Sequence, residues 1–174
     1  MRGVARRVLM LLIAVAAVAA LSAGTANARS VRFFSGYTGQ HTHWTWAGPG
    51  VGLIAWTTST DFSGYTACGS SWAGLNVDAA WNSESLHNGA QLDMLFSVQR
   101  SDGRRIPLRL FKITKAEPWP GHPAFGGQFH VGVWTPRGEY LKYGIVTTWI
   151  VNSGVFYGPA GVDTVKFNQS TRSC

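Results

Sequence analysis

Two neighbouring runs with different apolar patterns constrain the fold of this chain more than any other feature. From 129 to 134 apolar residues occupy every second position, the two-residue period of a half-buried strand. From 140 to 151 apolar residues occur at both odd and even positions, as in a strand that is covered on both faces. Pro136 and Gly138 separate the runs, so we predict a β-hairpin, followed by a third strand after the turn tripeptide 152–154. The longer strand should lie in the middle of a sheet.

Short β-type runs recur along the rest of the chain, and none of them has a sustained helical period. They lie at 31–34, 41–46, 51–58, 72–81, 92–98, 106–110 and 163–168. The runs at 92–98 and 106–110 should form a second hairpin, with Pro107 at an outer position or a bulge because it lacks an N–H. We therefore predict an all-β fold, an antiparallel β-sandwich, jelly roll or barrel of about 8–10 short strands.

Other segments have the composition of loops. Residues 59–71 are small and polar, and residues 117–127 contain three prolines and three glycines, which exclude a helix or a central strand. In the second hairpin we expect Leu110 to face the core with Ile106 and Leu108. On the opposite face we expect Asp93 to form a cross-strand ion pair with Arg109.

The first 28 residues have the pattern of a secretory signal peptide. Three arginines precede an apolar run at 8–21, and the small-x-small triplet 26–28 suits cleavage. The run is too short for a bilayer span, which leaves one secreted domain at 29–174 and no membrane span after cleavage. Cleavage would lower the net charge from +7 to +4, and no dense basic stripe points to nucleic acid.

The two cysteines, Cys68 and Cys174, should form a disulfide in an exported protein. A nucleophilic Cys68 is the alternative, and the oxidising compartment argues against it. The bridge would tie the last residue of the chain to its first half.

Aromatic residues are the first functional lead, because eight tryptophans occur in a chain with few charges. Flat rings stack on the C–H face of a sugar. If 41–46 is a strand, Trp44 and Trp46 share one face about 6.5–7 Å apart, and they are either sugar contacts or core. Trp119 lies in the proline-rich loop with His122, and we expect both to contact a ligand. The other tryptophans named as core are Trp56, Trp81, Trp134 and Trp149.

Histidines are the second lead. His41 and His43 should share the strand face opposite Trp44 and Trp46, and two histidines in such an H-x-H pattern can chelate one metal ion. A third ligand could come from His130, His122 or Asp93. The alternative is an exposed or hydrogen-bonded pair without metal, and the short-spaced Glu of a cupin-type site is absent. No metal or other cofactor is therefore expected.

Carboxylates and catalytic motifs give weaker signals. Glu84, Glu117 and Glu139 all fall outside the middle of predicted strands, so no facing pair of acids indicates a glycosidase. The chain has no G-x-S-x-G elbow, phosphate loop, CxxC motif or calcium loop.

These patterns favour a secreted, non-catalytic protein that binds an extracellular glycan or cell-wall polymer. A small secreted hydrolase or metal-dependent β-barrel enzyme is one alternative. A protein-binding module, such as a protease inhibitor or toxin that uses the rigid loop at 117–127, is another. The oligomeric state stays open.

Overall fold

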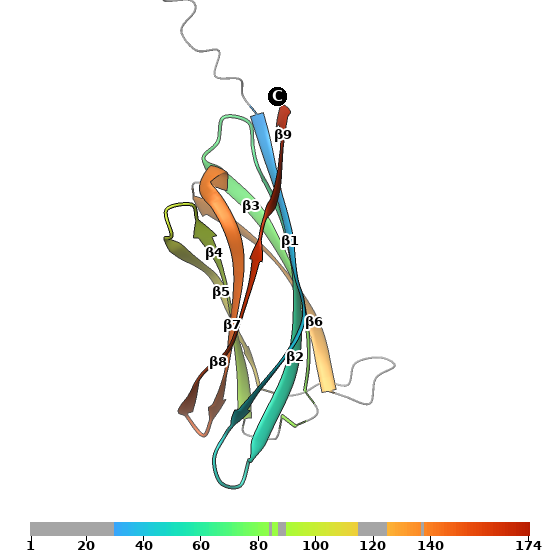
Figure 1. Ribbon diagram of the computed structural model, residues 1–174, viewed down its shortest axis with the longest axis vertical. Coiled ribbons are helices and arrows are strands. Elements are labelled where there is room, and N and C mark those ends of the chain that lie inside the picture. The colour runs from blue at the N-terminus through green and yellow to red at the C-terminus, as the bar shows by residue number, and fades with distance from the viewer. Residues whose placement is uncertain (1–29, 84, 87–89, 115–124, 137) are drawn as a thin grey trace, which may run out of the picture.

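Two antiparallel sheets pack face to face in a computed structural model that describes residues 30–83, 85–86, 90–114, 125–136 and 138–174 (Figure 1). The predicted all-β sandwich is confirmed. The five-stranded sheet has the order β6 (Phe125–Pro136), β3 (Trp72–Ser83), β2 (Leu53–Thr66), β1 (Ser30–Trp46) and β9 (Asn168–Ser173). The four-stranded sheet has the order β5 (Arg105–Ile113), β4 (Ala90–Arg100), β7 (Leu141–Asn152) and β8 (Val155–Lys166). A 3-10 turn, η1 (Gly138–Tyr140), is the only helical element in these ranges. The predicted signal peptide lies outside the described residues.

The core lies between the sheets and is built by alternation. In β4 the side chains of Leu92, Met94, Phe96 and Val98 are all fully buried, as their spacing predicted. Across the core, Trp56, Phe62, Leu75 and Val77 of the other sheet meet them. Each buried aliphatic or aromatic side chain of this size contributes about 1.5–3 kcal/mol relative to an exposed position.

β7 is confirmed as a central strand, because it pairs with β4 on one side and β8 on the other. The β7–β8 hairpin is also confirmed. Its two-residue turn has φ angles of 49° at Ser153 and 77° at Gly154, the left-handed pair that suits the twist of a tight hairpin.

The predicted hairpin between 129–134 and 140–151 is wrong. β6 pairs with β3 in the five-stranded sheet, whereas β7 lies in the four-stranded sheet. The residues between them, with η1, therefore cross from one layer to the other. Pro136 and Gly138 interrupt the strands as expected, but turn residues do not specify whether the next strand pairs with the last one.

The limits of one loop and of several strands differ from the predicted limits. β2 continues to Thr66, so the predicted loop at 59–71 is wrong over its first half: Thr60 and Phe62 point inward and are buried. The runs at 31–34 and 41–46 belong to the single strand β1, whose register shifts at a bulge near Gly39, where φ is 82°. Eight of the described strands have 9 to 17 residues, longer than expected.

β5 confirms one prediction and corrects two. It is the outer strand of its sheet, and its register with β4 shifts between Phe96 and Ser97, so Pro107 occupies both an edge and a bulged region. The shift turns Leu110 outward, and its side chain is exposed rather than in the core. The predicted Asp93–Arg109 pair does not form, because Asp93 lies opposite Lys112 and accepts a hydrogen bond from Gln91.

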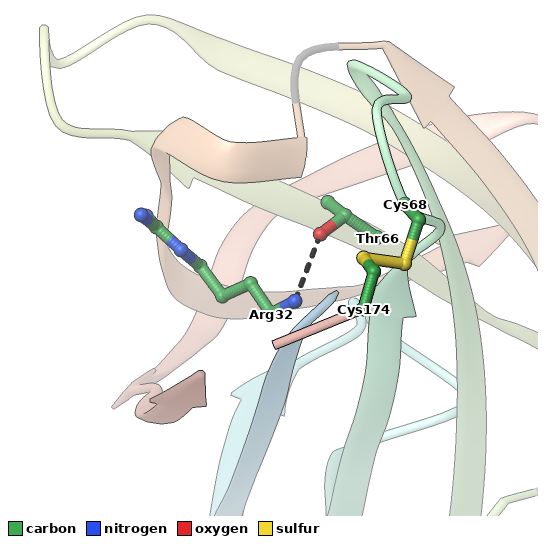
Figure 2. The surroundings of a disulfide bond; sticks show 4 residues. All are labelled: Arg32, Thr66, Cys68 and Cys174. Atoms are coloured by element: carbon green, nitrogen blue, oxygen red, sulfur yellow. Dashed lines mark hydrogen bonds between the residues drawn. A yellow bond between two sulfur atoms is a disulfide. The ribbon is translucent and has the colours of Figure 1, made fainter. Parts of the chain in front are cut away.

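The predicted disulfide is present. Cys68, in the β2–β3 loop, bonds to Cys174 beyond β9, and Figure 2 shows the bridge beside the Arg32 N–H that donates to Thr66 Oγ1. All six residues of the C-terminal strand β9 are exposed. The bridge ties the end of this strand to the β2–β3 loop, on the other side of β1. Without the bridge, β9 would be held by its pairing with β1 and by the hydrogen bond from Gln169 Nε2 to Leu141 O of β7.

Candidate functional site

Three aromatic side chains form a row on the outer face of the five-stranded sheet, the face turned away from the other sheet. Strand pairing aligns Phe33 with Tyr65, Tyr65 with Gly74, and Gly74 with Trp134. The rings of Phe33 and Tyr65 have their centroids 6.5 Å apart. All three are exposed, Trp134 to 63%. We call Phe33, Tyr65 and Trp134 the ring row.

Gly74 explains how an indole can lie flat in this row. A Cβ at Gly74 would be 3.3 Å from Trp134 Cη2, so the ring of Trp134 lies over the position where a side chain would stand. At the other end of the row, the guanidinium of Arg172 lies over Phe33, 5.6 Å from the ring centroid. The exposed Trp72, two residues before Gly74 on the same strand face, extends the aromatic surface.

A band of small polar side chains runs beside the ring row. Ser35 pairs with Ser63 and with Asn168, and Ser63 pairs with Asn76. These four residues, together with Phe33 and Tyr65 of the ring row, line a shallow hollow of about 380 Å³. We call Ser35, Ser63, Asn76 and Asn168 the polar band.

The next row on this face carries two carboxylates. Asp61 on β2 lies directly opposite Asp78 on β3, and Asp78 Oδ1 is 2.6 Å from His130 Nδ1 on β6. Tyr37 and Gln128 join them around a second open hollow of about 400 Å³. Like charges opposite each other repel, and His130 contacts only Asp78 of the two carboxylates.

Trp44 and Trp46 lie on the same outer face, and both are exposed. The sequence left open whether they are core, and the structure excludes it. They lie near the end of β1 that is far from the ring row: the rise of ~3.3 Å per residue puts roughly 35 Å between Phe33 and Trp44. Their outward neighbours across the sheet are Ala55 and Leu53, which offer no side-chain hydrogen bonds.

Four tryptophans predicted as core divide into three groups. Trp56 and Trp81 are buried, as predicted, and Trp149 is partly buried. Trp134 is exposed, so its assignment to the core is wrong. The even positions of 129–134 face outward on β6, and Trp134 shares that face with His130. Trp119 and His122 lie outside the described residues, as does most of the proline-rich loop, although 125–127 belong to β6.

The three histidines named as metal candidates do not come together. His41 and His43 share a face of β1, as predicted, whereas His130 is on the outer face with Asp78. Within the described ranges, no group of three His, Cys, Asp or Glu residues is arranged to hold a metal ion. Asp93, another predicted source of a third ligand, is buried in the four-stranded sheet beside Gln91.

His43 instead pairs with a residue that the sequence did not single out. Its Nε2 lies 2.9 Å from Asp163 Oδ2 on β8, and Thr58 donates to the same oxygen at 3.2 Å. His41 Nδ1 is 3.4 Å from the other carboxylate oxygen. Asp163 is buried, so this cluster joins β1 and β2 of one sheet to β8 of the other. Sequence gave no signal for it, because 120 residues separate the partners.

Two opposing effects set the pKa of Asp163. Burial raises it, because desolvation disfavours the charged form. The hydrogen bond from His43, the charges of His43 and His41, and the hydrogen bond from Thr58 outweigh burial, so the pKa of Asp163 lies below its usual value. The carboxylate is therefore a charged structural link between the sheets.

Asp61 and Tyr65 of the ring row were also missed by sequence reasoning, for a different reason. The segment 59–66 looked like a loop because its residues are small and polar. Its alternation of Thr58, Thr60 and Phe62 with Ser59, Asp61 and Ser63 was a usable signal for a strand with one polar face.

Comparisons with known proteins add little to this geometry. No protein-family model and no curated protein matches the chain. One solved structure, described as "X-ray structure of Northeast Structural Genomics Consortium target SoR45", aligns with 70% of this chain and 86% of its own, at 10% identity and a TM-score of 0.32. In the described part of the chain, no helix has the length and apolar character needed to cross a membrane.

Proposed function

We propose that this protein binds an extracellular glycan or cell-wall polymer, without chemical conversion, on the outer face of the five-stranded sheet. One observation carries the proposal: the ring row and the polar band lie in adjacent rows on that face. Flat rings stack against the C–H face of a pyranose, and hydroxyl and amide groups beside them bond to its hydroxyls. A sugar chain lying along the sheet would meet both kinds of contact.

The carboxylates add directional hydrogen-bond acceptors to the proposed site. Asp61 and Asp78 lie one row beyond the polar band on the same paired strands. A sugar hydroxyl that donates to either carboxylate would form a charge-assisted hydrogen bond. All these groups stand on paired strands, so little backbone entropy would be lost on binding.

Catalysis is a weaker alternative for the same residues. A glycosidase needs two facing acids, one of them enclosed so that it stays protonated as general acid. Asp61 and Asp78 face each other, but both are exposed, and Asp78 is engaged by His130. We therefore propose contact roles for them.

Secretion is part of the proposal. It is supported by the signal-like pattern of residues 1–28 and by the disulfide, since disulfides persist in oxidising compartments outside the cytosol.

Retention on insoluble glycans tests the binding proposal. Wild-type protein should be retained on at least one of chitin, cellulose and peptidoglycan, and Trp134→Ala should weaken that retention about tenfold or more, corresponding to ~1.4 kcal/mol. Trp46→Ala is the matched control, since Trp46 is exposed to 61% on the same sheet but lies far from the ring row. If the wild type binds none of the three glycans, or if Trp134→Ala and Trp46→Ala lose equal amounts of retention, the proposal is overturned.

A further inference from the structure

Two hairpin tips lie side by side at one end of the sandwich, the lower end in Figure 1. One is the β1–β2 turn and the other is the β7–β8 turn. Asn152 Nδ2 donates a 3.0 Å hydrogen bond to Ala47 O, and the Tyr157 hydroxyl lies 2.9 Å from where a Cβ on Gly48 would stand. These contacts make the two turns one unit, which we call the double tip.

Large apolar side chains project from the double tip into solvent. Each is about half exposed or more: Trp44, Trp46, Leu53, Val155 and Phe156. Neither segment around the tip carries any Asp, Glu, Lys, Arg or His residue, from 44 to 60 or from 144 to 162. Large exposed apolar side chains gathered at one tip, on both outer faces and without a charged residue among them, favour an interaction site over ordinary solvent contact.

The distribution of these side chains limits what can cover them. The side chains of Trp44 and Trp46 project into solvent from the outer face of the five-stranded sheet. Phe156 packs on Trp149, opposite Val151, on the outer face of the four-stranded sheet. A rigid protein surface, or a second copy of this chain, would cover one of these faces and leave the other wet. A fluid bilayer can surround a protruding tip on all sides.

Part of the backbone of the double tip is hydrogen-bonded internally, which suits a low-dielectric environment. In the β1–β2 turn Ala47 N–H donates to Gly52 O at 2.8 Å, and Gly52 N–H donates to Gly48 O at 2.9 Å. The β7–β8 turn is a closed two-residue turn between paired Asn152 and Val155. Paired N–H and C=O groups avoid the cost of several kcal/mol that each unsatisfied group would add in lipid.

We propose that the double tip docks this protein on a lipid bilayer, with Trp46 and Phe156 entering the interfacial region from opposite faces of the sandwich. Indole and phenyl rings suit that region, where their apolar surface is buried and indole N–H groups stay hydrated. Because the tip has no charge, binding should depend on apolar burial and not on anionic lipid or ionic strength. The site is separate from the ring row, so one molecule could hold a glycan and a membrane together.

Vesicle flotation tests this proposal. Protein recovered after export, with mass spectrometry showing that the apolar run at 8–21 is absent, is mixed with phosphatidylcholine vesicles. Wild type should float with the vesicles at both 0.05 M and about 0.5 M salt. Trp46→Glu and Phe156→Glu should each reduce the floated fraction about tenfold or more, because each places a charge in the interface.

Trp134→Glu is the matched control, with the same substitution at an equally exposed tryptophan on the other end of the same sheet. It should float like wild type and lose glycan retention, whereas the two tip variants should keep glycan retention. No flotation of wild type, loss of flotation in high salt, or an equal effect of Trp134→Glu would overturn the docking proposal and leave glycan binding untouched. Thermal melting of each variant excludes misfolding as the cause.

Discussion

Asp163 is the residue whose charge most directly links the two sheets. It is buried, and its carboxylate accepts hydrogen bonds from His43 and Thr58 of the opposite sheet. Removing one partner from such a buried group leaves the others unsatisfied, which costs about 1–3 kcal/mol. The position is therefore structural, although two histidines beside a carboxylate resemble part of a metal site.

The lowered pKa of Asp163 predicts loss of stability in acid. A carboxyl group with a depressed folded-state pKa contributes stability that is fully present above its unfolded pKa of ~3.9 and is lost as the pH falls toward the folded value. Urea unfolding between pH 6 and pH 2.5 should show this decline. Asp163→Asn should be less stable at pH 6 by about 1–3 kcal/mol and should show a shallower decline below pH 4. A decline equal to that of wild type would contradict the assignment.

Gly161 gives a test of packing at the same cluster. A Cβ at this position would collide with the His43 ring, so Gly161→Ala should destabilise the fold by about 1–3 kcal/mol. In a His43→Ala background the same substitution should cost much less, because the obstructing ring is gone. Gly132→Ala is the control, since a Cβ there meets only Asn76 Oδ1 at an ordinary 3.5 Å. Additive effects of Gly161→Ala and His43→Ala on the free energy of unfolding, measured with denaturant, would refute the contact.

Sequence predicted which face a residue occupies better than which residues it meets. Alternation along one strand placed Trp44 and Trp46 opposite His41 and His43, and that arrangement is correct. The Asp163 partner depends on how two sheets stack, and no local pattern records that. Trp134 had the outward phase in its strand, and only the general tendency of tryptophan to be buried argued for the core.

Strands β5, β6 and β7 show the same difference between local properties, which the sequence predicts, and strand partners, which it does not. The missing N–H of Pro107 is a local property, and it correctly predicted an edge or a bulge. The bulge then shifts the phase of the strand, so the alternation that includes Leu110 fails beyond it. The chain between β6 and β7 has the residues of a hairpin turn but crosses between layers, because strand pairing is decided by the partners β3 and β4.

The β7–β8 turn offers a prediction at this scale. Ser153 has a φ of 49°, a left-handed conformation that a serine adopts less readily than an asparagine. Ser153→Asn creates an Asn-Gly pair, the preferred sequence for a two-residue hairpin, and should stabilise the protein by up to about 1 kcal/mol. Ser153→Val should destabilise it, because a β-branched residue is strained at this φ. The turn geometry would be contradicted if chemical denaturation showed Ser153→Val to be more stable than Ser153→Asn.

For the whole molecule, the disulfide holds the strand that completes the five-stranded sheet. Cys68 and Cys174 are separated by 106 residues, and β9 forms the sheet edge beside Ser30–Ser35 of β1. The double variant Cys68→Ser, Cys174→Ser should lose about 2–4 kcal/mol of stability, which for this length lowers the melting temperature by roughly 10 °C.

In the double cysteine variant, stability should be lost locally before the whole fold is affected. All six residues of β9 are exposed, so the strand has little apolar burial of its own to keep it on β1 once the bridge is gone. Hydrogen exchange in the double variant should therefore accelerate first in β9 and in Ser30–Ser35 of β1, while β4 and β7 stay protected. Because Phe33 and Arg172 sit in that region, glycan retention should weaken more than vesicle flotation, whose residues lie at the other end. Uniform acceleration across both sheets would show that the bridge stabilises the sandwich as a whole rather than its last strand.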